Sequence, residues 1–204
     1  MRRYRLPVSG HGAIAGLLLT GGASSRMGVD KARLRRGGRS LAERAAGALG
    51  EVCDLLLEVG PGVGGLEAVR EPEPGAGPLA AFAAGAAALH ERGHEGAVLL
   101  LAVDLPFVEA SLLRLLAGHE PGGTTLVPVA DGVPQPLCGR YQPDAGREAA
   151  RLVARGSRSM RALLDEVAWQ ALPEDVWRAV ASPHALDDVD TPADVERFRL
   201  EWPG

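Results

Sequence analysis

The sequence predicts an α/β fold with a mainly parallel sheet and helices on both of its faces. Strand-sized apolar runs alternate with helix-sized segments up to about residue 130, a rhythm typical of parallel sheets covered by helices. Residues 96–103 form a continuous apolar run, as expected for a strand that is buried on both faces. Residues 79–92 are rich in alanine, so a helix there can pack closely on a sheet.

The individual elements follow from local patterns. Strands are expected at residues 13–19, 53–59, 66–70, 96–103, 124–130 and 136–141. Ser40 is a typical N-cap residue for a helix over residues 41–49, and Thr191 is the expected N-cap of a last helix over residues 192–200. Further helices are expected at residues 79–92, 109–117, 143–153 and 159–167, with a turn at 75–78 and an ambiguous stretch at 172–187.

Length and composition limit the classes of protein to consider. The chain has 204 residues, is 46% apolar and shows no linker, so we expect one domain over residues 13–204 behind a flexible segment at 1–12. A net charge of −4 argues against a nucleic-acid binder. No apolar run approaches the ~20 residues of a membrane span, and residues 1–12 lack the apolar stretch of a secretory signal. We therefore expect a cytoplasmic protein with two buried thiols, Cys53 and Cys138.

The loop after the first expected strand is the most informative segment. Residues 19–31 read LTGGASSRMGVDK and combine three glycines with Arg26 and Lys31. Glycines let backbone N–H groups approach a ligand closely, and successive N–H groups form an anion-binding nest. The loop lacks the Gly-Lys-Ser/Thr of the Walker pattern. A literal GxGxxG at residues 60–65 has no room for the helix that a dinucleotide site needs, so we interpret it as a surface turn. The first loop predicts a polyphosphate site.

Asp104 directly follows the apolar run at residues 96–103. The carboxyl ends of parallel strands meet at one edge of a sheet, where ligands bind, so Asp104 and the glycine-rich loop are expected at the same edge. Mg²⁺ in nucleotide sites is held by one or two carboxylates and by phosphate oxygens. Asp104 is therefore a candidate Mg²⁺ ligand; the alternative is a strand terminus or the N-cap of the helix over residues 109–117.

These residues also carry a resemblance to a known family. The loop at 19–31 resembles the signature L-x-G-G-x-S-x-R-M-G-x-D-K of the nucleotidyltransferases that activate molybdopterin, and is most similar to the molybdenum cofactor guanylyltransferase family. The similarity continues in order at GPL (77–79), DLPF (104–107), QPL (135–137) and DTP (190–192). It implies a three-layer, Rossmann-like nucleotidyltransferase fold with a mainly parallel mixed sheet. It also implies transfer of GMP from GTP to the phosphate of molybdopterin or the molybdenum cofactor, with release of pyrophosphate.

The resemblance implies roles for particular residues. Arg26, Lys31 and Asp104 would be catalytic: Arg26 would hold phosphates, Lys31 would neutralise charge on the leaving pyrophosphate, and Asp104 would bind Mg²⁺. Asp190 or Asp188 would complete the metal site; the alternative is that this segment only caps the last helix. The expected nucleotide-binding set is Leu19, Thr20, Gly21, Gly22, Arg26, Lys31, Glu58, Glu71 and Asp104. The expected acceptor-binding set is Gln135, Asp188 and, from a basic helix start at 155–161 that suits a phosphate, Arg158. Molybdoenzyme-maturation proteins are further partners that such an activity implies.

Several positions bear on which base is used. Gly21 lacks a Cβ and leaves room for a purine, where the cytidylyl relatives carry alanine. Thr20 stands where alanine is usual in the family. Glu58 stands where asparagine is frequent, and Glu71 where aspartate is frequent. The two glutamate carboxylates can accept hydrogen bonds from guanine N–H groups or from ribose hydroxyls. DVDTP at residues 188–192 also occurs in cytidylyl relatives. The alternatives are a cytidylyltransferase, a transferase for another phosphorylated acceptor, and a non-catalytic nucleotide-binding module.

Overall fold

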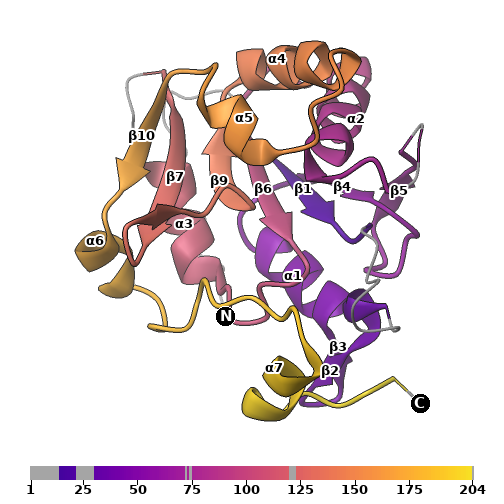
Figure 1. The fold of residues 1–204 in the computed structure, drawn as a ribbon, viewed down its shortest axis with the longest axis vertical. Coiled ribbons are helices and arrows are strands. Elements are labelled where there is room, and N and C mark those ends of the chain that lie inside the picture. Colours follow the sequence, from indigo (N-terminus) through magenta and orange to yellow (C-terminus); the bar gives the residue numbers. More distant parts are fainter. Residues whose placement is uncertain (1–13, 22–29, 72, 74, 120–122, 204) are drawn as a thin grey trace, which may run out of the picture.

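A mixed sheet forms the centre of the molecule (Figure 1). The computed structural model describes residues 14–21, 30–71, 73, 75–119 and 123–203. The strand order is β10-β7-β9-β6-β1-β4-β5, with β8 paired to β7. Only β8 and β9 run against the other strands of this sheet within the described residues. The strands are β1 (Ala15–Leu19), β4 (Leu55–Val59), β5 (Glu67–Val69), β6 (Val98–Ala102), β7 (Thr125–Ala130), β8 (Val133–Pro134), β9 (Cys138–Tyr141) and β10 (Trp169–Leu172).

Helices cover both faces of this sheet. In Figure 1 α2 (Pro78–Glu91), α4 (Pro143–Ala154) and α5 (Met160–Leu164) lie above it, while α1 (Leu41–Gly50) and α3 (Ala110–Gly118) lie below it. Two further helices, α6 (Glu174–Arg178) and α7 (Pro192–Arg197), contribute buried residues to the lower layer. Successive strand residues serve opposite layers, so that Leu17 and Leu19 pack with α2 whereas Leu18 packs with α1.

Local sequence explains where the main helices begin and how closely they pack. The Ser40 side chain accepts from the backbone N–H of Glu43, whose carboxylate accepts from the N–H of Ser40, which completes a capping box for α1. Gly85 lets α2 approach the sheet closely, because a Cβ there would lie 2.8 Å from side-chain atoms of Leu17 and Val59. These contacts fix α2 over β1 and β4.

The predicted fold class is confirmed, with additions. Each predicted strand and helix has a counterpart in the structure, the ends differing by a few residues. The ambiguous stretch at 172–187 contains α6. The sequence analysis missed β8, β10 and the two-stranded hairpin of β2 (Arg35–Arg36) and β3 (Arg39–Ser40).

Both cysteines are buried and free. Among the described residues no helix is long and apolar enough to cross a membrane. The expected flexible segment at 1–12 lies outside the described residues.

Candidate active site

A cavity of about 260 Å³ opens at the carboxyl edge of the sheet. The ends of β1 and β6, the start of α2 and the segment after β5 form its walls. This is the edge at which open parallel sheets bind ligands, and it is where the sequence placed the glycine-rich loop and Asp104. The lining residues are Leu19, Thr20, Gly21, Asp30, Lys31, Glu71, Gly75, Gly77, Pro78, Ala81, Ala102, Val103, Asp104 and Leu137.

Asp104 lies where β6 ends, and its carboxylate needs a cation. Its Oδ1 atom is buried and accepts no hydrogen bond within the described part of the chain. The pKa of Asp104 is raised to about 6, chiefly by burial; the Lys31 ammonium lowers this pKa, and the carboxylates of Asp190 and Asp188 raise it. When the carboxylate is ionised, Oδ1 has no hydrogen bond from the described residues that would compensate for its desolvation. The environment therefore favours a positively charged partner for Asp104.

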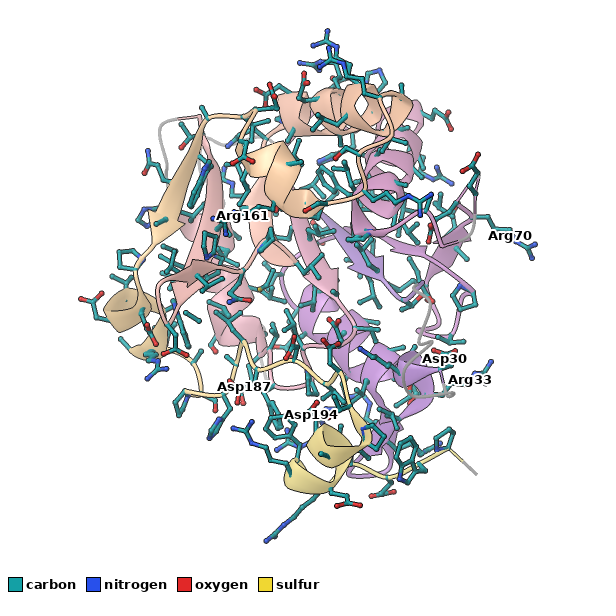
Figure 2. The ribbon with its side chains drawn as sticks, viewed as in Figure 1. Asp30, Arg33, Arg70, Arg161, Asp187 and Asp194 are labelled. Carbon is teal, nitrogen blue, oxygen red and sulfur yellow. The ribbon has the colours of Figure 1, made fainter. Side chains whose placement is uncertain are left out.

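The C-terminal segment 188–190 runs directly beside Asp104. The backbone N–H of Val189 donates to the carbonyl of Asp104 over 2.9 Å. The N–H groups of Asp190 and Thr191 donate to the carboxylate of Asp194, which joins this segment to the start of α7. Figure 2 shows Asp194 and Asp187, which flank the segment, in the same lower half of the view as Asp30. The DVDTP sequence is therefore both the start of α7 and part of the site.

Lys31 connects the first loop to that segment. Its ammonium lies 2.5 Å from Oδ1 of Asp190, and its side chain is only 17% exposed. Lys31 begins a short 3₁₀ helix (Lys31–Arg33), and the Asp30 carboxylate caps this helix by accepting from the N–H of Ala32. Asp30 thus orients the backbone that carries Lys31. The ammonium stands between the C-terminal segment and the cavity, within reach of a bound anion.

Glu71 and Gly21 meet on the opposite wall of the cavity. A Cβ at Gly21 would lie 2.6 Å from Oε1 of Glu71, so the two can approach only because residue 21 is glycine. Oε2 of Glu71 is buried and has no hydrogen-bond partner among the described residues. Burial raises the pKa of Glu71, and the backbone N–H of Gly75 opposes this shift. Glu71 therefore offers a cavity ligand a carboxylate with acceptor capacity to spare.

The structure does not bring Glu58 into the cavity, although sequence reasoning placed it in the nucleotide-binding set. Its side chain is fully buried, and both of its carboxylate oxygens accept bonds from the protein itself. The donors are Thr20, Val63 and Gly64. Side chains of β4 alternate between the two faces of the sheet, and Glu58 lies on the face opposite to Leu57 and Val59, which pack with α2. Its carboxylate therefore has no exposed atom to offer a base or a ribose.

The remaining predicted residues stand at different distances from the cavity. Asp188 and Asp190 adjoin it through the contacts above, and Arg158 packs its backbone against Gly77, a lining residue. Gln135 bonds through its side chain to the carbonyl of Val133 and does not line the cavity. Arg161, from the same basic stretch as Arg158, belongs to α5 and lies apart from Asp30 and Asp194 in the view of Figure 2. Gly22 and Arg26 lie outside the described residues.

Sequence reasoning overlooked part of the cavity wall. Gly77 and Pro78 line it at the start of α2, and Leu137 lines it from the segment before β9. All three fall in the GPL and QPL motifs, which were recognised in the sequence but received no cavity role. Gly77 adopts φ +100° and sits against the backbone of Arg158, so only glycine fits there comfortably.

The carboxylate oxygens at this edge of the sheet are suitable ligands for a hard divalent cation. Asp104 presents a buried carboxylate oxygen with no partner in the described residues, and the carboxylates of Asp188 and Asp190 are close enough to influence its pKa. Oxygen ligands of this kind suit Mg²⁺, which commonly takes one or two carboxylates together with phosphate oxygens and water. Within the described ranges no group of three or more His, Cys, Asp or Glu side chains could hold a metal ion by itself.

Comparison with known proteins places the chain in a family. The sequence profile of the MobA-like NTP transferase domain matches residues 16–172. A relative from Opitutus terrae, named "Probable molybdenum cofactor guanylyltransferase", is 37% identical over 87% of this chain and 94% of its own length. A relative of the same name from Mycobacterium avium is 37% identical over 74% of this chain and 81% of its own.

A solved structure supports the fold. The crystal structure of molybdopterin-guanine dinucleotide biosynthesis protein A from Archaeoglobus fulgidus aligns with a TM-score of 0.75 and 24% identity, over 90% of this chain and 95% of that one. The nucleotidyl transferase from Methanothermobacter thermautotrophicus aligns with a TM-score of 0.67 over 92% and 96%. With these folds and the profile match in agreement, the chain belongs to the family of MobA-like NTP transferase domains.

Proposed function

We propose that this protein transfers GMP from GTP to the phosphate of molybdopterin or the molybdenum cofactor and releases pyrophosphate. The observation that carries the proposal is the cavity at the carboxyl edge of the sheet, where Asp104, Lys31 and Gly21 meet. The names of the relatives that are 37% identical support the choice of nucleotide and acceptor.

The reaction needs positioning and charge neutralisation more than covalent chemistry. An oxygen of the acceptor phosphate attacks the α-phosphorus of GTP, the bond from that phosphorus to the bridging oxygen breaks, and pyrophosphate leaves. Lys31 exchanges its contact with Asp190 for the phosphates and neutralises the charge that develops on the leaving group. For Arg26 and Gly22, which lie outside the described residues, the family resemblance implies binding of the nucleotide phosphates.

Asp104 would hold Mg²⁺ at this edge, with Asp190 as the second carboxylate. When bound, the cation neutralises phosphate charge and orients the phosphate oxygens. Asp104 itself supplies a buried oxygen that has no hydrogen-bond partner in the described part of the chain, and release of Asp190 from Lys31 supplies the other. The same exchange therefore prepares both the ammonium and the carboxylate for a bound nucleotide.

The wall formed by Gly21 and Glu71 supports a guanine base. Gly21 allows the Glu71 carboxylate to lie against it, and the free acceptor capacity of Glu71 suits the N1–H and N2–H₂ donors of guanine or the hydroxyls of ribose. Arg158 and Asp188, which adjoin the cavity, would bind the acceptor, with Gln135 outside the cavity lining. One feature favours a second candidate, a cytidylyltransferase: DVDTP at residues 188–192 is a form shared with cytidylyl relatives.

Nucleotide protection against thermal unfolding tests the choice of base. A ligand present at 100 times its Kd stabilises the folded state by ~2.7 kcal/mol. We expect GTP with Mg²⁺ to raise the melting temperature in a concentration-dependent way, and CTP to raise it far less at equal concentration. Protection by CTP with none by GTP would overturn the guanylyl assignment and favour the second candidate. Chelation of Mg²⁺ should remove most of the GTP effect.

A further inference from the structure

Glu58 is a fully buried carboxylate that does not line the cavity. It lies on β4 with 0% of its surface exposed. Its Oε1 accepts from the Thr20 hydroxyl over 2.6 Å and from the N–H of Val63 over 2.8 Å, while its Oε2 accepts from the N–H of Gly64 over 2.8 Å. Burial of a carboxylate is costly unless such bonds compensate for lost water. These three donors belong to two loops that are far apart in sequence.

The glycine-rich turn at 60–65 is the first of these loops. Its GxGxxG sequence was interpreted above as a surface turn, yet two of its amides point inward at the Glu58 carboxylate. A Cβ at Gly64 would lie 2.9 Å from Oε2 of Glu58, so glycine is what allows this amide to approach. The turn thus binds an anion as a backbone nest does, and the anion is supplied by the chain itself.

Thr20 begins the second loop, at the cavity. The backbone N–H groups of Thr20 and Gly21 both donate to the carbonyl of Val59, over 3.0 and 3.2 Å. Gly60 fits tightly underneath, since a Cβ there would lie 2.4 Å from the Thr20 hydroxyl oxygen. Thr20 is itself only 5% exposed. The Thr20 hydroxyl donates its proton to Glu58, which does not line the cavity. This bond holds the Thr20 side chain in place from outside the cavity.

We propose that Glu58 is a positioning residue for nucleotide binding, acting through Thr20 to set the place of Gly21 in the cavity wall. The clamp formed by Glu58, Thr20, Val63 and Gly64 joins the end of β1 to the turn at 60–65. Gly21 follows Thr20 directly and lies against Glu71 in the cavity wall, so a displaced Thr20 displaces the wall that a base would meet. The expected effect on nucleotide affinity rests on the proposed function above.

Glutamine cannot replace Glu58 in this clamp without loss. If the amide oxygen takes the place of Oε1, the NH₂ group faces the N–H of Gly64. If the amide is reversed, the NH₂ group faces the N–H of Val63. In either orientation one buried donor meets another donor and loses its acceptor, which is more costly than the loss of one exposed bond. Glu58→Gln therefore loosens the clamp while changing side-chain volume very little.

The experiment compares Glu58→Gln, Thr20→Val and the double variant in two measurements. The first is amide hydrogen exchange of the free protein, in which Gly21, Val63 and Gly64 should exchange faster in Glu58→Gln. The second is steady-state kinetics with GTP, in which KM should rise roughly tenfold while kcat changes by less than about twofold, because a charge-assisted bond outside the reacting centre is lost. The double variant should lose less than the sum of the two single losses, because both substitutions act on one hydrogen-bonded clamp.

Two further variants make the result specific. Thr20→Ser keeps the hydroxyl and should retain most of the affinity that Thr20→Val loses; this comparison also decides the matter if Glu58→Gln does not fold. Glu67→Gln on the neighbouring strand β5 removes an exposed carboxylate paired with Arg92, a contact of small energetic value, and should leave KM unchanged.

The two proposals can fail separately. Unchanged exchange at Gly21 in Glu58→Gln, an unchanged KM, or additive effects of Glu58→Gln and Thr20→Val would each overturn the positioning role. Faster exchange at Gly21 in a protein that binds no GTP would instead leave the clamp standing and overturn the guanylyl function.

Discussion

At the scale of single residues, Asp104 shows how a binding site costs stability. Burial raises the pKa of this carboxyl from its usual value near 3.8 to about 6 in the folded protein. Between these two values the folded state binds more protons than the unfolded state, so stability falls as the pH rises through this window. At neutral pH the ionised carboxylate therefore lowers the stability of the free protein, and the proposed Mg²⁺ and nucleotide would compensate for that cost.

Asp104→Asn should therefore stabilise the free protein above pH 6. Asparagine is neutral, like the protonated form that the folded state favours. We expect a gain on the order of 1–2 kcal/mol at pH 7.5, because one pKa unit corresponds to ~1.4 kcal/mol and the carboxylate retains part of its solvation. Denaturant unfolding at pH 7.5 and at pH 3.5 measures the effect, which should vanish at the lower pH. A destabilised variant at pH 7.5 would contradict this account of the site.

Gly21 gives a second residue-scale prediction. In Gly21→Ala the new methyl group would meet Oε1 of Glu71 at 2.6 Å, and the end of that flexible side chain can move aside. The unfolding free energy should then change by less than about 1 kcal/mol, while affinity for GTP falls roughly tenfold because Glu71 is displaced in the cavity. Titration calorimetry measures the affinity. In a Glu71→Ala background the same substitution should have little effect; an equal loss there would show that Glu71 is not the cause.

At the scale of elements, the packing of α2 on the sheet depends on one position. A Cβ at Gly85 would lie 2.8 Å from atoms of both Leu17 and Val59 in the core. Gly85→Ala should destabilise the protein by about 1–3 kcal/mol, the usual cost of overpacking, although alanine is the better helix former. Denaturant unfolding measures the change.

Gly47 in α1 is the matched control for that substitution. A Cβ at this position would meet only the end of the flexible Arg39 side chain, at 3.2 Å. Gly47→Ala should therefore be neutral or stabilise by up to about 1 kcal/mol. Equal effects of the two substitutions would mean that helix propensity, and not contact with the sheet, decides the outcome at Gly85.

The elements that sequence predicted are those with strong patterns. β6 is apolar throughout and α1 begins at a capping box, so hydrophobic pattern and cap agree. β10 was missed because its sequence WQAL has two exposed residues and no apolar run, so it becomes a strand only through pairing with β7. The hairpin of β2 and β3 has two residues in each strand and is rich in arginine, too short for any periodicity to appear.

At the scale of the whole molecule, the site joins segments from both ends of the chain. Lys31 and Asp190 are 159 positions apart and form an ion pair. Sequence could place Asp104 and the first loop at one edge, because both follow parallel strands. It could not show that Lys31 pairs with Asp190, nor that Glu58 turns inward to Thr20, because such orientations depend on loop geometry and on which face of a strand a loop covers.

Pyrophosphate release from GTP tests the central claim most directly. The assay contains the protein, Mg²⁺, molybdopterin and either GTP or CTP. We expect pyrophosphate with GTP only, in amounts that depend on the acceptor, and at least a hundredfold slower release by Asp104→Asn, since metal-assisted charge stabilisation is worth several kcal/mol. Release from CTP but not GTP, or turnover that survives in Asp104→Asn, would contradict the guanylyl transfer proposed for this site.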